Sequence, residues 1–282
     1  MLIPLNDFVF KKIFGEKKDR HLLIGLLSAI LNEKITNITI MGETLERSMR
    51  EDKLGKLDVK AELPFGEKLN IEVQLKDEYN MVKRTLFYWS KLYTEDFQVG
   101  GKYRDLTKTI TINIVNFSFL KEPYYHNVFH LKNDNTNNIL TKNMEIHFIE
   151  MPKFRGADPD ITNPLDRWLL FLDEKTPQKS LKEVTKMDPL IKKAEKKLNI
   201  LRHDPKAREQ YESWAKLLSD HVSALDTAER KGEKRGEKRG EERGIEKGKL
   251  EVAASLLKSG MSYEQIAEIT GITVEKIKKM VQ

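Results

Sequence analysis

Alternating apolar and polar residues between positions 56 and 75 predict a β-hairpin. One face carries the apolar side chains Leu57, Val59, Ala61, Leu63, Leu69, Ile71, Val73 and Leu75. The other face carries Asp58, Lys60, Glu62, Asn70, Glu72 and Gln74, and the turn falls at positions 64–67. Pairing Asp58 with Gln74 and Lys60 with Glu72 puts every apolar residue on the core side. It also leaves a loop of about five residues, a usual hairpin length.

The polar face of this hairpin brings two carboxylates to one patch. Side chains at neighbouring positions of one face lie roughly 5–8 Å apart. Asp58 and Glu72 can therefore share a hard divalent cation such as Mg²⁺ through their oxygens. The main-chain carbonyl of Val73 points sideways from the strand and can add a ligand. Hairpin geometry alone favours a plainer interpretation, in which both acids are ordinary residues of a solvent-facing strand.

Helical and strand spacings continue on both sides of the hairpin. Helices are predicted over 6–14, 19–32 and 80–97, the last with Met81, Thr85, Tyr88, Trp89, Leu92 and Tyr93 on its inner face. Strands are predicted at 35–41, 108–117, 127–131 and 144–152. This order of elements indicates an α/β fold with a mixed central sheet flanked by helices.

The second half of the chain is predicted to be a helical extension. Helical patterns cover 163–173, 178–186 and 188–202 and continue from 205. Between 228 and 249 a glycine stands at every fourth position, and the intervening residues are nearly all Glu, Lys and Arg. Without an apolar stripe, and with each interior glycine costing about 1 kcal/mol relative to alanine, this tract is predicted to be a solvated, marginal helix or a flexible arm. Close approach of two helices along the glycines is the less favoured alternative.

Residues 250–282 regain the pattern of a small helical module. A first helix ends at Gly260, Ser262 and Gln265 have the spacing of a capping box for a second, and Thr273 can cap a third that runs to Val281. Ala267, Gly271 and Ile277 have the spacing of a helix-turn-helix. Lysines on the third helix can meet DNA phosphates, whereas self-association is the plainer interpretation. The predicted domains are 1–152, 153–227, 228–249 and 250–282.

Composition narrows the classes of protein. Apolar residues make up 39% of the 282 residues and charged residues 33%, with a formal net charge of +6, which is compatible with a polyanionic partner. The chain has no cysteine, which excludes disulfides and zinc–thiolate sites and suits a reducing cytoplasm. No signal peptide and no apolar run of membrane-spanning length is present, so no membrane association is expected. Walker, Rossmann and HExxH motifs are absent.

Four short sequence motifs, in this order along the chain, resemble those of the recombination-promoting nuclease and transposase family of the PD-(D/E)xK superfamily. They are Asn6–Gly15, Leu57–Val59, Asn70–Gln74 and Arg84–Trp89, and the resemblance covers about residues 1–150. It implies a restriction-endonuclease-like core, Mg²⁺ or Mn²⁺ as cofactor, and DNA as substrate. It also implies that Asp58 and Glu72 are metal ligands, which reverses the plainer interpretation of the hairpin.

The resemblance extends to further site residues. Gln74 stands where the superfamily motif has lysine; an amide can only hydrogen-bond, whereas an ammonium also stabilises negative charge. Lys60 can supply that cation, although a plain cross-strand ion pair with Glu72 is the favoured interpretation. Glu33 is the candidate third acid, with a solvated helix-terminal residue as the alternative. Arg84 and Tyr88 lie one helical turn apart and are predicted to contact the scissile phosphate or to brace the site.

These features together predict a cytoplasmic, metal-dependent DNA endonuclease of the recombination-promoting or transposase type. One alternative is a catalytically inactive DNA-binding regulatory protein that reads DNA through its C-terminal module. The other is a protein that forms homo-oligomers through its C-terminal helices.

Overall fold

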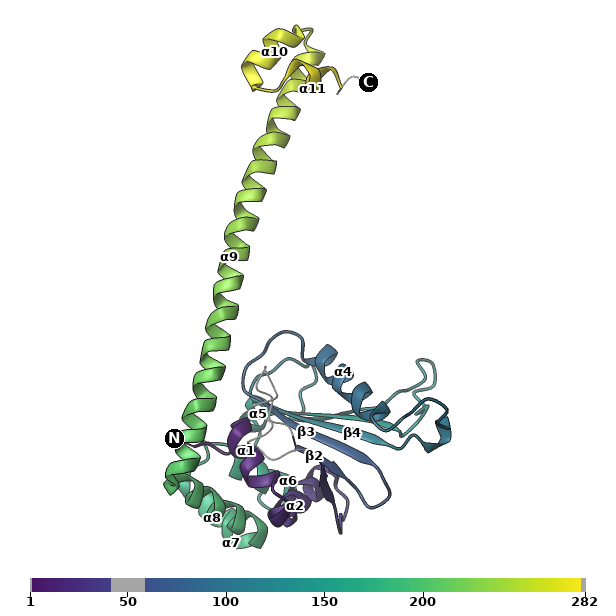
Figure 1. The fold of residues 1–282 in the computed structure, drawn as a ribbon, viewed down its shortest axis with the longest axis vertical. Coiled ribbons are helices and arrows are strands. Elements are labelled where there is room, and N and C mark those ends of the chain that lie inside the picture. The colour runs from purple at the N-terminus through teal and green to yellow at the C-terminus, as the bar shows by residue number, and fades with distance from the viewer. Residues whose placement is uncertain (1, 42–58, 280–282) are drawn as a thin grey trace. The chain divides into compact units, whose positions relative to one another are not determined.

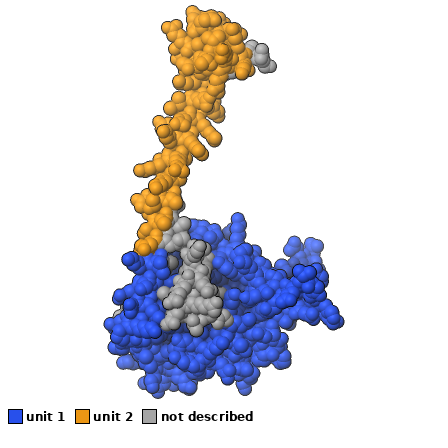
Figure 2. Space-filling model, viewed as in Figure 1, with its two compact units in different colours: residues 1–217 blue, residues 218–282 orange. Residues whose placement is uncertain are grey.

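The computed structural model describes residues 2–41 and 59–279. Its two compact units are residues 1–217 and 218–282, coloured separately in Figure 2. The first unit holds a sheet with helices on both faces, and the second holds a charged helical segment and a small helical module.

Six strands form one mixed sheet in the described part of the first unit (Figure 1). The strands are β1 (Thr39–Met41), β2 (Val59–Glu62), β3 (Lys68–Gln74), β4 (Thr109–Val115), β5 (His126–Phe129) and β6 (Met144–Glu150). Their order is β1-β2-β3-β4-β6-β5. The central pairs β3–β4 and β4–β6 are parallel, while β1–β2, β2–β3 and β5–β6 are antiparallel. The centre of the sheet is thus buried on both faces, as parallel strands require.

One face of the sheet is apolar and packs against α1 (Asp7–Phe14), α2 (Arg20–Leu31) and α6 (Pro164–Leu172). The sheet contributes Leu69, Ile71, Val73, Ile110, Ile112 and Ile114 to this core. Local signals start and stop these helices: the Asn6 side chain caps α1, and Asn163 caps α6. Asn32 ends α2 in the left-handed conformation. Figure 1 shows these helices on one side of the strands and α4 (Met81–Thr94) on the other.

Outer helices complete the first unit. These are α5 (Met151–Gly156), α7 (Gln178–Met187), α8 (Pro189–His203) and the start of α9 (Pro205–Lys258), with short 3₁₀ turns at Lys17–Asp19 and Tyr103–Asp105. The indole Nε1 of Trp214 donates a 3.0 Å hydrogen bond to Asp7 Oδ1 and so ties α9 to the start of α1. Burial raises the pKa of the Asp7 carboxyl. Asp7 therefore serves packing at this position.

The second unit contains the glycine repeat and a compact three-helix module. Five glycines, 232, 236, 240, 244 and 248, lie inside α9 with open space around each. The module combines the end of α9 with α10 (Tyr263–Thr270) and α11 (Val274–Lys278) around Ala253, Ile266, Ile272 and Ile277. The predicted capping box of Ser262 and Gln265 is present, and Gly271 ends α10 at φ +68°. Thr273 occupies the N-cap of α11 but its side chain makes no capping hydrogen bond.

The α/β fold with a mixed central sheet and flanking helices is confirmed. The predicted pairing within the hairpin was wrong by two residues: Lys60 lies opposite Asn70, not Glu72. A hydrogen bond from Leu63 N to Glu67 O closes the loop two residues before Leu69, the partner expected for Leu63, and Gly66 takes φ +80° inside the loop. Because the shift is an even number of residues, each side chain keeps its predicted face. Helix α5 was not predicted; residues 151–152 belong to it and not to the preceding strand.

Candidate active site

The face of the sheet beneath α4 is polar and buried. Along β3 it carries Lys68, Asn70 and Glu72, and along β4 Thr109, Thr111 and Asn113, each less than 10% exposed. The parallel register places Asn70 beside Thr111 and Glu72 beside Asn113. Burial of six polar residues in one patch costs free energy unless they are paired. A patch of this kind is typical of a functional site.

Glu72 lies at the carboxyl end of this patch, beside Asn113, and pairs with Arg84 of α4. The Arg84 Nη2 atom donates to Glu72 Oε1, and the two side chains are only 7% and 8% exposed. Arg84 Nη1 also lies 3.7 Å from Glu78 Oε2. Tyr88, one turn further along α4, has its ring centroid 5.9 Å from the Arg84 guanidinium. The predicted common face of Arg84 and Tyr88 is therefore present, and it meets the candidate glutamate.

The rest of the patch is only partly hydrogen-bonded. Thr85 Oγ1 donates to Asn113 Oδ1 at 3.2 Å, and Asn113 Nδ2 donates to the carbonyl of His147 at 3.1 Å. In contrast, Asn70 Oδ1 and the hydroxyl oxygens of Thr109 and Thr111 have no hydrogen-bond partner in the described chain. Asn70 lies two residues before Glu72 on the same face of β3, and Thr111 lies beside Asn70. Unpaired buried oxygens of this kind can accept hydrogen bonds from water.

The end of β3 presents two further polar groups, the main-chain carbonyl of Val73 and the side-chain amide of Gln74. Lys68 N donates to the Lys108 carbonyl and Gln74 O accepts from Asn116 N, so the backbone groups of both residues point toward β4. Because successive residues of a strand point their backbone groups to opposite sides, the carbonyl of Val73 points toward β2. Described β2 begins at Val59, opposite Ile71, and so does not reach Val73. The Gln74 side chain, on the face of Glu72, donates from Nε2 to the Lys76 carbonyl at 3.2 Å. A metal held by Glu72 would therefore find the Val73 carbonyl at the same end of the strand.

Two other predicted site residues lie away from Glu72. Lys60 Nζ is 3.5 Å from Glu95 Oε1, so the predicted ion pair with Glu72 was wrong, because the register places Lys60 opposite Asn70. Glu33 is exposed and follows the left-handed cap of α2, and no contact between described residues joins it to Glu72. Asp58 lies outside the described residues. Within those residues, no group of three His, Asp or Glu side chains has the arrangement of a metal site.

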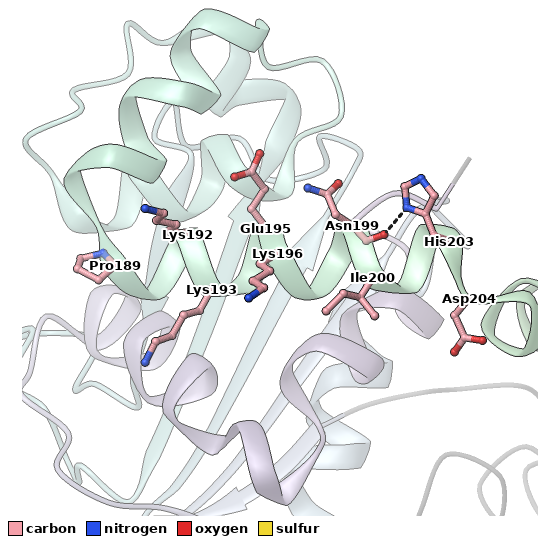
Figure 3. Close-up of a pocket in the computed structure, with 9 residues that line it drawn as sticks. All are labelled: Pro189, Lys192, Lys193, Glu195, Lys196, Asn199, Ile200, His203 and Asp204. Carbon is pink, nitrogen blue, oxygen red and sulfur yellow. Dashed lines mark hydrogen bonds between the residues drawn. The ribbon is translucent and has the colours of Figure 1, made fainter.

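A hollow of about 940 Å³ lies along the outer side of α8, far from this chemistry (Figure 3). Lys192, Lys193 and Lys196 line it, together with Glu195, His203 and other residues of the same helix. Helix α8 packs against α1, α2 and α6, on the side of the sheet opposite α4. The lining mixes these lysines with Glu195 and Asp204, and the hollow is separate from the polar patch around Glu72.

A chain of titratable side chains crosses β5 and β6, which sequence reasoning missed. His126 Nε2 lies 2.9 Å from His147 Nδ1, and His147 Nε2 lies 2.9 Å from Glu145 Oε1. Lys108 and His130 also contact Glu145, at 2.9 and 3.2 Å. With Glu145 ionised, His147 donates to it and His126 donates to His147. The pairing of strands distant in sequence creates this chain, and four-residue spacing of His126 and His130 gave no sign of it.

We expect this chain to make stability depend on pH. Burial, reinforced by the neighbouring His147, lowers the pKa of His126 to about 4. In the unfolded chain histidine titrates near 6.5, so the unfolded state binds more protons between these values and the free energy of unfolding falls as pH drops from about 6.5 to about 4, by up to about 3 kcal/mol. Chemical denaturation over this pH range checks it. His126→Gln, which keeps the Nε2-type donor, should flatten the dependence, and exposed His203→Gln should not; identical profiles for all three proteins would contradict the assignment.

The fold and the polar hairpin are consistent with a PD-(D/E)XK restriction-endonuclease-like α/β protein. A family model described as PD-(D/E)XK nuclease family transposase matches residues 4–228. The chain therefore belongs to this nuclease and transposase-type family. Comparisons with curated proteins and with solved structures find no match. No helix in the described part of the chain is both long and apolar enough to cross a membrane.

Proposed function

We propose that this protein is a metal-dependent DNA endonuclease of the recombination-promoting or transposase type, acting in the cytoplasm. The observation that carries the proposal is the buried carboxylate of Glu72, in a hairpin that resembles the superfamily's motif with Gln74 in place of lysine, on a strand face with other buried polar groups. The net charge of +6 and the family match support DNA as the substrate.

In this proposal Asp58, Glu72 and the Val73 carbonyl hold Mg²⁺ or Mn²⁺, which have the same preference for oxygen ligands. When bound, the ion supplies an activated water and neutralises charge on the phosphate. The unpaired buried oxygen of Asn70, two residues before Glu72 on the same face, is available to a water of such an ion. Glu33 stays a proposed third acid.

The remaining residues act by positioning. Gln74 orients the attacking water by hydrogen bonding, as an amide can. Arg84 pairs with the Glu72 carboxylate and so holds it in one orientation, and the proposed role of Arg84 and Tyr88 is to contact the scissile phosphate or to brace the site. Lys60, on the same face of the neighbouring strand and opposite Asn70, is the proposed source of positive charge on this face.

Nicking of supercoiled plasmid tests this function. We expect full-length protein to convert plasmid to the open-circular form with Mg²⁺ or Mn²⁺, to stop on addition of EDTA, and to lose activity on Asp58→Ala. Nicking at an equal rate with EDTA, or by the variant, would contradict metal-dependent cleavage at this hairpin. DNA binding without cleavage that is lost on deleting residues 250–282 would instead support a regulatory DNA-binding protein. Loss of self-association after that deletion would identify the terminal helices as the oligomerisation element.

A further inference from the structure

The outer side of α4 carries an aromatic ring between two lysines. Phe87 is 53% exposed, and the exposed residues Lys83 and Lys91 lie one helical turn before and after it on the same stripe. The Lys91 ammonium lies 4.8 Å from the centroid of the Phe87 ring. The stripe thus offers a partly open π-face with positive charge on both sides.

A series of contacts joins this stripe to Glu72. The rings of Phe87 and Tyr88 meet edge to face, with centroids 5.4 Å apart. The Arg84 guanidinium lies 5.9 Å from the Tyr88 ring and pairs with Glu72. The stripe therefore borders the candidate active site.

Helix α4 leaves several large apolar side chains on its outer side. It buries Met81 and Leu92 together with Arg84 and Thr85, while Val82, Leu86 and Phe87 are 48%, 41% and 53% exposed. A helix that only covered a sheet would bury its large apolar side chains. Apolar groups left exposed beside a polar site indicate a surface that binds something.

We propose that Lys83, Phe87 and Lys91 form a nucleotide platform, on which an unpaired base stacks against Phe87 while the two lysines meet the flanking phosphates. Proteins that bind single strands combine aromatic faces with positive charge in this way, because every base has a π-face and every nucleotide a phosphate. The two lysines favour nucleic acid over an apolar protein segment. Bases in an intact duplex stack on one another, so the platform selects single-stranded or locally unpaired DNA. This inference rests on the proposed function and specifies its substrate.

Quenching of 2-aminopurine fluorescence in a short single-stranded oligonucleotide tests the platform, with full-length Glu72→Gln protein so that no cleavage is needed. We expect quenching on binding, and Phe87→Leu, which keeps apolar bulk but removes the π-face, should abolish the quenching and weaken binding about 5- to 100-fold. Replacing both lysines with glutamine should reduce the slope of log affinity against log salt by about 1.4. Leu86→Ala, on the same helix and similarly exposed, is the matched control and should change neither.

Several results would overturn the platform. Undiminished quenching by Phe87→Leu, or equal losses for Phe87→Leu and Leu86→Ala, would show that stacking on Phe87 is not involved. A lower mass of the Phe87→Leu protein in light scattering would show that the stripe joins two copies of the chain. Cleavage by the wild-type protein is scored separately. Quenching that depends on Phe87, without cleavage by the wild-type protein, would contradict the proposed endonuclease and support the platform. Cleavage with binding that does not depend on Phe87 would support the endonuclease and contradict the platform.

Discussion

Replacing Glu72 with glutamine is expected to lower Mg²⁺-dependent plasmid nicking by about 10²- to 10³-fold, because a metal ligand lost from a hydrolytic site removes several kcal/mol of transition-state stabilisation. Glutamine has the size of glutamate, and its amide oxygen can still accept from Arg84, so the fold should remain. Initial rates of nicking at saturating Mg²⁺, compared with the wild-type protein, measure the effect.

Glu62→Gln is the matched control for this experiment. Glu62 belongs to the same hairpin and the same polar face but lies opposite Lys68, at the turn end of the strands. We expect its nicking rate to stay within about twofold of wild type, as a surface change away from a site should. Equal rates for Glu72→Gln and wild type would place the hydrolytic centre elsewhere in the protein or in a contaminant.

Arg84→Met is expected to lower the free energy of unfolding by about 3–5 kcal/mol, because it leaves the buried Glu72 carboxylate without its guanidinium partner. Methionine preserves much of the side-chain length, so most of the loss is electrostatic. Adding Glu72→Gln to Arg84→Met should recover a large part of the lost free energy of unfolding, because the glutamine amide leaves no unpaired buried charge. Denaturant titrations of the single and double variants provide the double-mutant cycle.

The control for this cycle is a solvent-exposed ion pair of the same type. Arg230 and Asp226 lie 2.7 Å apart within α9, with side chains 69% and 59% exposed. Arg230→Met should cost no more than about 0.5 kcal/mol. If Arg84→Met proves equally mild, or the double variant recovers nothing, the Arg84–Glu72 pair does not govern the stability of this patch.

Local patterns predicted the elements of the fold well. Alternation at Ile110, Ile112 and Ile114 predicted β4, and helical spacing predicted α1, α2 and α4 within a few residues. The face on which each hairpin side chain lies was also predictable, because side chains alternate between the two faces of a strand. The offset between its strands was not, since two registers two residues apart satisfy the same pattern. The choice between them came from the loop closed by Leu63 and Glu67.

The candidate site was predictable in part. The sequence placed Glu72 and Gln74 on one face of a strand, and Arg84 and Tyr88 on one face of a helix. The structure pairs Arg84 of that helix with Glu72 of the strand. The sequence could not indicate that Lys60 pairs with Glu95, because that contact depends on where α4 ends over the sheet. Asp58 and Glu33 stay proposals.

By itself, the sequence determined which residues face together on each strand of the hairpin, the capping box of Ser262 and Gln265, and the family to which the chain belongs. Each of these depends on residues a few positions apart or on the order of short motifs. The tertiary structure alone decided that the polar face of β3 is buried, that Arg84 neutralises Glu72, and that His126 meets His147 across two strands. Those contacts join residues 12 and 21 positions apart through the packing of α4 and the pairing of β5 with β6, and no local periodicity encodes which surface a helix will cover.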